Sequence, residues 1–80
     1  MNLVEVTEFL VKSVVKEPDL VSVSEFDEDE FKVIQVLVSN DDMPKVIGKD
    51  GSTINAIRTL VQSSSYVNND KKIKINVDSF

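Results

Sequence analysis

The chain has 80 residues, of which 41% are hydrophobic, and this is enough for one small domain with a modest core. It contains no cysteine and no histidine. Disulfides and thiolate zinc sites are therefore excluded, the usual general base is missing, and an enzyme is not expected. No apolar run reaches the length of a signal peptide or membrane span, so we expect a cytoplasmic protein without membrane insertion, cofactor or small-molecule substrate.

The net charge of −5 is unevenly distributed along the chain. Residues 1–42 contain three basic and eleven acidic side chains, which gives −8. Residues 43–80 contain six basic and three acidic side chains, which gives +3. Because local potential governs the binding of nucleic acid more than total charge does, the second half can carry a weak basic surface on an acidic protein.

A first helix is predicted over residues 2–17. Asn2 is a suitable N-cap, Glu5 completes a capping box three residues later, and Pro18 ends the helix. One face of this helix is apolar and is formed by Leu3, Val6, Leu10 and Val14.

Two strands are predicted next. Residues 20–26 alternate between apolar and polar and indicate a half-buried strand, whereas residues 31–38 are almost entirely apolar, as in the middle of a sheet. The acidic residues 27–30 are expected at the tip of the hairpin. A calcium site is rejected here because the loop lacks the glycine and glutamate of the EF-hand pattern, and a solvated turn is preferred.

Residues 41–47 predict a short second helix that ends at Gly48, with Asp41 or Asp42 as its cap and Pro44 near its start. A third helix is predicted after Gly51. Its cap is Ser52 or Thr53, its apolar positions are Ile54, Ile57, Leu60 and Val61, and it frays over residues 63–70.

Residues 71–78 alternate cleanly and predict a last strand, with Ile73, Ile75 and Val77 facing inward. The order α-β-β-α-α-β predicts an α+β fold with three helices on one face of a three-stranded sheet. The other face is left to solvent or a partner. If Ile34, Val36 and Val38 face the helices, Val33 and Leu37 emerge on the open face, where an apolar pair can mark an interface.

Both glycines of the chain lie in one four-residue loop, Gly48-Lys49-Asp50-Gly51. Gly48 allows a backbone conformation that residues with a Cβ cannot adopt. Gly51 has no side chain at the point where another backbone would approach. The N-terminus of the following helix, together with Lys49, would suit a phosphate. A helical hairpin without a ligand is the alternative, and a nucleotide-binding P-loop is excluded because the lysine lies between the glycines.

The segment VIGKDGSTINAI resembles the core of the KH domain, in which G-x-x-G is flanked by apolar residues. The α-β-β-α-α-β order is that of the bacterial, type II arrangement. The whole chain, and DDMPKVIGKDGSTINAIRTLV most of all, is similar to the KhpA family of small stand-alone bacterial KH proteins. The resemblance implies a single type II KH domain over residues 1–80.

The resemblance implies that about four nucleotides of single-stranded RNA or DNA bind here, with the loop clamping their backbone. Isoleucines beside the loop and one or two residues of strand 31–38 would line a groove, although these isoleucines suit the core better. Arg58 would meet a phosphate or a base edge. The RNA-binding residues implied are Ile47, Gly48, Lys49, Asp50, Gly51, Ser52, Ile54, Asn55 and Arg58.

The family further implies an RNA chaperone or post-transcriptional regulator that dimerises or pairs with a KhpB (EloR/Jag)-like protein in cell elongation, cell shape and cell wall biogenesis. Relatives commonly carry basic residues where this chain has Ser52 and Asn55, and Asp50 adds an acid. Weak, micromolar RNA binding is therefore expected. The alternative is a protein-interaction module that pairs through the open sheet face or through the G-x-x-G loop itself, with little RNA contact.

Overall fold

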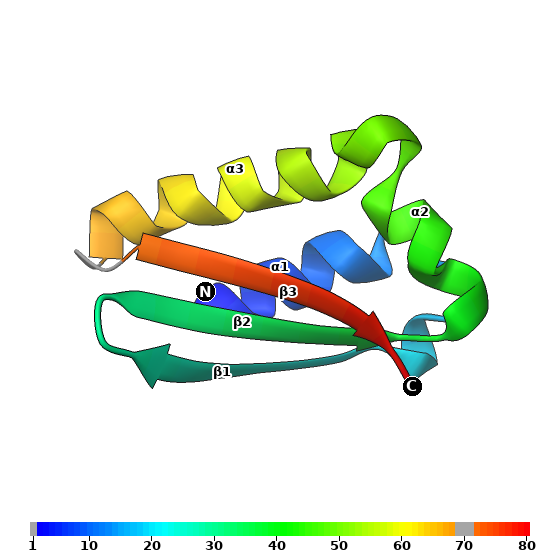
Figure 1. The fold of residues 1–80 in the computed structure, drawn as a ribbon, viewed down its shortest axis with the longest axis horizontal. Helices are drawn as coiled ribbons and strands as arrows, with labels where there is room; N and C mark the ends of the chain where they lie inside the picture. Colours follow the sequence, from blue (N-terminus) through cyan, green and yellow to red (C-terminus); the bar gives the residue numbers. More distant parts are fainter. Residues whose placement is uncertain (1, 69–71) are drawn as a thin grey trace.

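Three helices lie on one face of a three-stranded sheet in the computed structural model, which describes residues 2–68 and 72–80, with only the backbone of 64–68 (Figure 1). Short 3₁₀ turns precede β1, α2 and α3. The order α-β-β-α-α-β confirms the predicted fold. In chain order the elements are α1 (Leu3–Lys12), β1 (Ser22–Glu28), β2 (Phe31–Val38), α2 (Met43–Ile47), α3 (Ser52–Asn68) and β3 (Lys72–Ser79).

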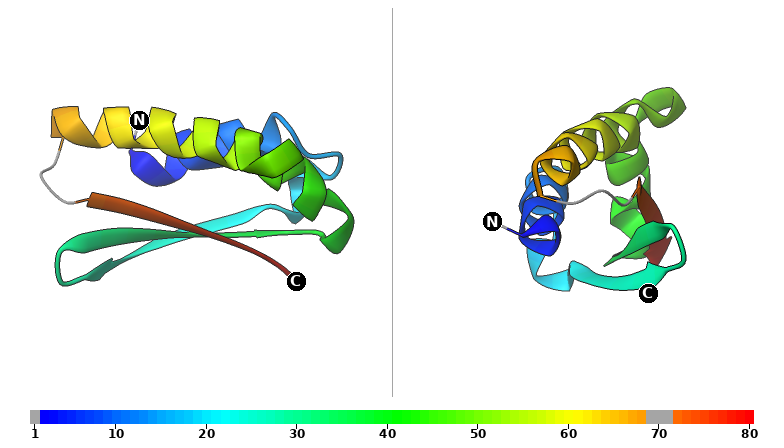
Figure 2. Two further views of the ribbon diagram at one scale, coloured as in Figure 1. Left: turned by 45° about the horizontal axis from the view of Figure 1, so that its top comes forward. Right: turned by 90° about the vertical axis from the view of Figure 1, so that its left-hand side faces the viewer.

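The sheet has the order β1-β2-β3, so β2 is the central strand, as its apolar sequence predicts. β1 and β2 form an antiparallel hairpin, in which Glu28 pairs with Phe31 across the turn. β2 and β3 are parallel, and the chain between them crosses over through α2 and α3. Viewed from the end, the helices cover one side of the sheet and leave the other side uncovered (Figure 2).

A single apolar core fills the space between the sheet and the helices. Val11, Val36, Val46 and Val61 are fully buried there. None of the described helices is long and apolar enough to cross a membrane. Within the described side chains, the buried residues of this core are Leu3, Val11, Ile34, Val36, Val38, Val46, Ile54, Ile57, Val61, Ile73 and Ile75.

The start of α1 agrees with the prediction, but its end does not. Asn2 Oδ1 accepts a hydrogen bond from Glu5 N at 2.8 Å, and Asn2 Nδ2 donates to Glu5 Oε1 at 2.9 Å. The helix ends at Lys12, well before the predicted end at residue 17. Beyond it, the N–H groups of Lys16 and Glu17 donate to a distant carboxylate instead of to helical carbonyls.

That carboxylate belongs to Asp42, which is only 1% exposed. It accepts from Lys16 N and Glu17 N, each at 3.0 Å, and from Ser39 Oγ at 3.1 Å, while Lys45 Nζ lies 3.9 Å away. The Lys16 N–H lowers the pKa of Asp42 most. Burial opposes this effect, and the Glu17 N–H, the Ser39 hydroxyl and the Lys45 charge add to it. Asp42 occupies the N-cap position of α2 without making the predicted capping bond, because its oxygens are already engaged.

α3 is longer than predicted, and it starts differently. Ser52 has helical dihedral angles (φ −63°, ψ −40°), so it is the first residue of the helix rather than its cap. The helix continues through residues 63–68, which were predicted to fray. The Ser63 hydroxyl donates to Thr59 O at 3.0 Å, so it satisfies itself without disrupting the helix. Residues 69–70 of the predicted turn and residue 71 of the predicted strand lie outside the described residues.

The alternation of the strands is as predicted, with one correction. Ile34, Val36 and Val38 face the core, and β3 directs Ile73 and Ile75 the same way. Val33 and Leu37 therefore lie on the open face. Val33 is nevertheless only 1% exposed, so the predicted exposed pair is wrong at this position. Val33 lies between Phe26 and Lys74 in the register, and these larger neighbours cover it.

Candidate nucleic-acid interface

The G-x-x-G loop joins α2 to α3 at one end of the molecule (Figure 1). Gly48 has φ 77° and ψ 175°, and its N–H donates to Pro44 O at 2.8 Å. A Cβ on Gly48 would lie 2.8 Å from Thr53 N and Thr53 Cβ, and closer still to Thr53 Oγ1. Gly48 is therefore required both for its backbone conformation and for the close approach of Thr53.

Gly51 has different surroundings. Its φ is also 77°, but a Cβ there would meet only Asn55 Nδ2, at 3.7 Å. The space beside Gly51 is thus open from outside, so a ligand backbone can reach the loop there. The tight approach within the chain occurs at Gly48.

The acid between the glycines has a conformational explanation. Asp50 has φ 56° and ψ 27°, in the left-handed region, where aspartate and asparagine are tolerated better than most residues. Two successive residues with positive φ, Asp50 and Gly51, bring the chain round to the start of α3. The acid therefore suits the turn, whatever it does to a bound phosphate.

The loop presents both backbone donors and a full positive charge. Gly51 N donates to Gly48 O at 3.3 Å, which closes the turn. The first N–H groups of the 17-residue helix α3 then point toward the loop with the positive end of the helix dipole. Lys49 is exposed and makes no ion pair among the described residues. An anion of phosphate size fits this combination of groups.

Gly51, Asn55 and Arg58 follow one another along one face of α3, because residues spaced by three and four lie on the same side of a helix. Asn55 Oδ1 accepts a hydrogen bond from Arg58 Nη1 at 2.8 Å, and Asn55 Nδ2 is the group beside Gly51. The structure therefore brings together most of the predicted site residues. Asn55 holds the guanidinium about two helical turns from the loop, with further N–H donors available to a ligand.

The predicted isoleucines separate into two roles. The sequence favoured the core for Ile47 too, but this was wrong: Ile47, the last residue of α2, is 38% exposed beside the loop and offers apolar surface to a ligand. Ile54 is 9% exposed and Ile57 is 4% exposed, and both belong to the core. The interpretation of these two as core residues, favoured from the sequence, agrees with their burial.

The strand beside α2 and α3 is β3, not the predicted wall at residues 31–38. β2 is paired on both edges, and its helix-facing side chains are buried. Gln62 Nε2 donates to Ile73 O at 3.0 Å and joins α3 to β3. Sequence reasoning missed Gln62 and Thr53, although Gln62 follows Arg58 by four residues and so continues the row that begins at Gly51.

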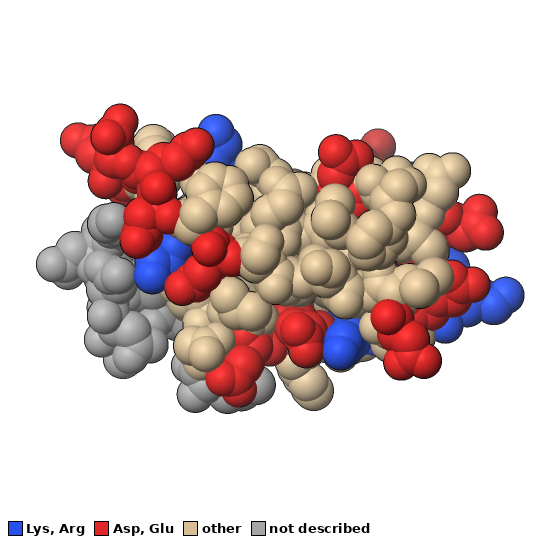
Figure 3. Space-filling view, turned by 90° about the horizontal axis from the view of Figure 1, so that it is seen from below, with Lys and Arg blue, Asp and Glu red and all other residues tan. Residues whose placement is uncertain are grey.

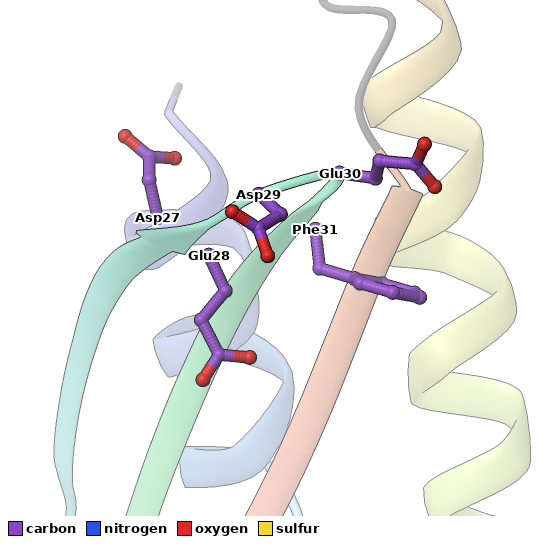
Figure 4. Close-up of a pocket in the computed structure, with 5 residues that line it drawn as sticks. All are labelled: Asp27, Glu28, Asp29, Glu30 and Phe31. Atoms are coloured by element: carbon purple, nitrogen blue, oxygen red, sulfur yellow. The ribbon is translucent and has the colours of Figure 1, made fainter.

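The acidic hairpin tip lies at the opposite end of the molecule from the loop (Figure 1). A surface hollow there is lined by Asp27, Glu28, Asp29, Glu30 and Phe31. Their carboxylates point in different directions (Figure 4). No group of three or more acidic side chains that could hold a metal ion is found in the described part of the chain. The negative charge of this tip repels a polyanion.

Similar proteins include three named "RNA-binding protein KhpA". The one from Thermotoga maritima is 40% identical over 73 residues, which cover 91% of this chain and 95% of that protein. The one from Clostridium perfringens is 39% identical over 69 residues, which cover 86% of this chain and 92% of that protein. The one from Streptomyces coelicolor is 44% identical over 59 residues, which cover 74% of this chain and 75% of that protein.

Solved structures of Era share the fold. One is Era in complex with MgGDPNP and nucleotides 1506–1542 of 16S ribosomal RNA, with a TM-score of 0.74 and 16% identity, covering 98% of this chain and 30% of Era. Another is Aquifex aeolicus Era, with a TM-score of 0.73 and 16% identity. At this identity the likeness shows the fold alone.

A family model described as "KhpA/KhpB, KH domain" matches residues 4–78, almost the whole described chain. Its relatives are named as RNA-binding proteins rather than enzymes. On its fold, its G-x-x-G loop and these matches, the chain belongs to the KhpA/KhpB KH-domain family.

Proposed function

We propose that this protein binds single-stranded RNA at the loop between α2 and α3, as one KH domain formed by the whole chain. The observation that carries the proposal is the open side of Gly51, where the loop, the N-terminus of α3 and the Asn55–Arg58 pair meet. The name of the relatives, RNA-binding protein KhpA, supports RNA as the ligand.

In this mechanism a phosphate lies against Gly51, where no side chain intervenes. Backbone N–H groups at the start of α3 donate to its oxygens, and Lys49 supplies a mobile positive charge. The next phosphate or base edge meets Arg58, which Asn55 holds in place. Ile47 provides apolar contact for a base beside the loop. β3 forms the far wall, and Gln62 joins it to α3.

Binding by the isolated domain is expected to be weak, in roughly the micromolar range or above. Ser52 and Asn55 contribute no charge, and the carboxylate of Asp50 lies inside the clamp. The net charge of −5 adds a general repulsion. Because few phosphates are neutralised, the affinity should fall only shallowly with salt.

The test is fluorescence anisotropy with a short labelled single-stranded RNA at low salt, using variants that keep the loop fold. Gly51→Asn suits the positive φ and places a side chain where the phosphate would lie. Lys49→Ala removes the charge. We expect a loss of about tenfold or more for Gly51→Asn and about threefold for Lys49→Ala. Gly48 variants are avoided because a side chain there collides with Thr53.

Lys12→Ala is the matched control, because Lys12 is an exposed lysine on α1 that pairs with Glu8. It changes the net charge as Lys49→Ala does, and it should leave RNA binding nearly unchanged. If wild type shows no binding at low salt, or if Gly51→Asn binds RNA as wild type does, the clamp is not an RNA site.

The finer roles follow the family. The protein would act as an RNA chaperone or post-transcriptional regulator in cell elongation and envelope growth, as a dimer or with a KhpB (EloR/Jag)-like partner. Crosslinking in the native cell, followed by sequencing of bound RNA and identification of bound protein, tests these roles. The second candidate function is a protein-interaction module, and the exposed aromatic residues of the open sheet face support it. Recovery of a KhpB-like protein without RNA would favour this candidate over RNA binding.

A further inference from the structure

One carboxylate of this acidic chain lies inside the molecule. The other acidic side chains that the structure describes are exposed or half-buried, and the underside of the molecule shows many of them gathered at its two ends (Figure 3). Asp42 is 1% exposed and is the one buried charged residue among the described side chains. Because a carboxylate loses its hydration on burial, hydrogen bonds inside the protein must replace that hydration. The partners of Asp42 therefore show what this buried charge holds together.

Both oxygens of Asp42 accept hydrogen bonds. Oδ1 accepts from Lys16 N and Oδ2 accepts from Glu17 N, each at 3.0 Å. Oδ2 also accepts from Ser39 Oγ at 3.1 Å, and Lys45 Nζ lies 3.9 Å from Oδ1. An amide at this place would offer a single oxygen and would turn its own N–H groups toward a donor. The surroundings of Asp42 therefore select a carboxylate.

The bonds of Asp42 join parts of the chain that are far apart in sequence. Lys16 and Glu17 follow α1 and precede Asp42 by 26 and 25 residues. Ser39 directly follows the last residue of β2. Asp42 itself directly precedes Met43, the first residue of α2, and its side chain makes no capping bond to that helix. The carboxylate thus attaches the start of α2 to the segment that follows α1.

α2 needs an attachment of this kind. It has five residues, of which Val46 alone is buried, and a helix of this length is not stable without tertiary contacts. The N–H of Gly48 donates to Pro44 O at 2.8 Å, so the first glycine of the loop continues the last turn of α2. A shift at the start of α2 is therefore passed directly to the G-x-x-G loop.

We propose that Asp42 is a positioning residue of the RNA clamp, because its carboxylate fixes the start of α2 and so places the G-x-x-G loop relative to α3 and Arg58. The inference rests on the proposed RNA-binding function. Asp42 is buried and does not touch RNA itself. Without its bonds, the loop would have to be ordered at the moment of binding, and this ordering reduces affinity.

The first measurement is fluorescence anisotropy with a short labelled single-stranded RNA, at a temperature where unfolding curves show that each variant is folded. Asp42→Asn should weaken binding by about fivefold, because buried N–H groups lose their acceptor. Ser39→Ala removes one of the donors to Asp42 and should weaken binding by about twofold. This milder variant decides the matter if Asp42→Asn does not fold.

Leu3→Ala is the control for lost stability. Leu3 belongs to the core at the start of α1, so its truncation destabilises the protein and leaves the bonds of Asp42 in place. The folded Leu3→Ala variant should bind RNA as wild type does. An effect of Asp42 on the loop is separated in this way from an effect on the fold as a whole.

The second measurement needs no RNA. Gly48 and Gly51 are the two glycines of the chain and both lie in the loop, so ¹⁵N-labelled glycine gives an NMR spectrum with two backbone amide signals that report on the loop alone. Asp42→Asn and Ser39→Ala should shift both signals in the free protein. Leu3→Ala should leave both signals where they are in wild type.

Three results would overturn the positioning role of Asp42. They are wild-type RNA affinity in folded Asp42→Asn and Ser39→Ala, an equal loss of affinity in Leu3→Ala, and glycine signals that neither Asp42→Asn nor Ser39→Ala moves. A wild-type protein that binds no RNA at low salt would overturn the proposed function, and with it the RNA role of Asp42. The glycine signals would then still decide whether Asp42 places the loop.

Discussion

Arg58 Nη1 donates a 2.8 Å hydrogen bond to Asn55 Oδ1, while Asn55 Nδ2 lies beside the open side of Gly51. Asn55 thus orients the cationic residue of α3 and lies next to the loop. It stands at a position where a basic residue was expected from the family, and its amide oxygen accepts the hydrogen bond from Arg58.

Asn55→Ala should weaken RNA binding by about threefold, because Arg58 loses the bond that orients it. Asn55→Asp should weaken it by about tenfold, because a carboxylate neutralises the guanidinium and repels phosphate. Anisotropy with a short single-stranded RNA measures both. Ser63→Ala, which removes an exposed hydroxyl two turns further along α3, is the control. Equal affinity for Asn55→Asp and wild type would show that Arg58 does not contact RNA.

Asp50→Asn should tighten RNA binding by about two- to fivefold at low salt, since it removes an acid from the clamp and keeps a residue that tolerates positive φ. The gain should shrink as salt screens the charge. Asp50→Ala makes the same charge change but adds left-handed strain of about 1 kcal/mol. A gain that persists unchanged in high salt would point to a cause other than the carboxylate charge.

The two glycines should differ in their tolerance of alanine. Gly51→Ala meets open space and should cost about 1 kcal/mol of unfolding free energy through its positive φ alone. Gly48→Ala adds a collision with the backbone and side chain of Thr53 and should cost at least about 2 kcal/mol more. Urea unfolding of the two variants checks the order, and equal stability would contradict the packing described at Gly48.

Asp42 should make stability depend on pH. Its pKa is held below the ordinary value of 3.8, chiefly by the Lys16 N–H, so the folded protein keeps the carboxylate ionised to lower pH than the unfolded chain does. The stabilisation is complete above the ordinary pKa and declines as the pH falls through the lowered pKa, because the unfolded state takes up the proton first.

Asp42→Asn should therefore lower the Tm at neutral pH by roughly ten degrees, since an amide offers one acceptor where the carboxylate uses two. The difference from wild type should narrow toward pH 3. Asp41→Asn is the matched control, an exposed neighbour of the same charge. Thermal melts across this pH range test the prediction, and a constant difference at all pH values would exclude ionisation of Asp42 as the cause.

The local features of this fold could be predicted from the sequence. The cap at Asn2, the alternation of Ile73 and Ile75 and the turn at Gly48 each depend on residues within a few positions of one another. The end of α1 could not be predicted, because the acceptor for Glu17 N lies 25 residues further along the chain, in Asp42. Local propensity describes the helix, whereas tertiary hydrogen bonds fix the chain that follows it.

The candidate site divides in the same way. The loop and the unusual conformation of Gly48 could be predicted from the two glycines, and Arg58 was implied by the resemblance to KH domains. The positive φ of Asp50 was not predicted. The neighbouring strand depends on sheet order, which only the pairing of β2 with both β1 and β3 establishes. The burial of Val33 could not be predicted for the same reason. The alternation places Val33 on the open face, but its burial depends on Phe26, its partner across the hairpin.

Gln62 also affects whether a strand of another chain can pair with the outer edge of the sheet. Among the described strands, β3 pairs with β2 alone, so its outer edge offers N–H and C=O groups to which a foreign strand could add. The bond from Gln62 Nε2 to Ile73 O occupies one of these groups near the start of β3. An incoming strand would have to displace this side chain before it could run the full length of β3. One uncharged amide thus shortens the stretch of edge along which unwanted fibre-like pairing could begin.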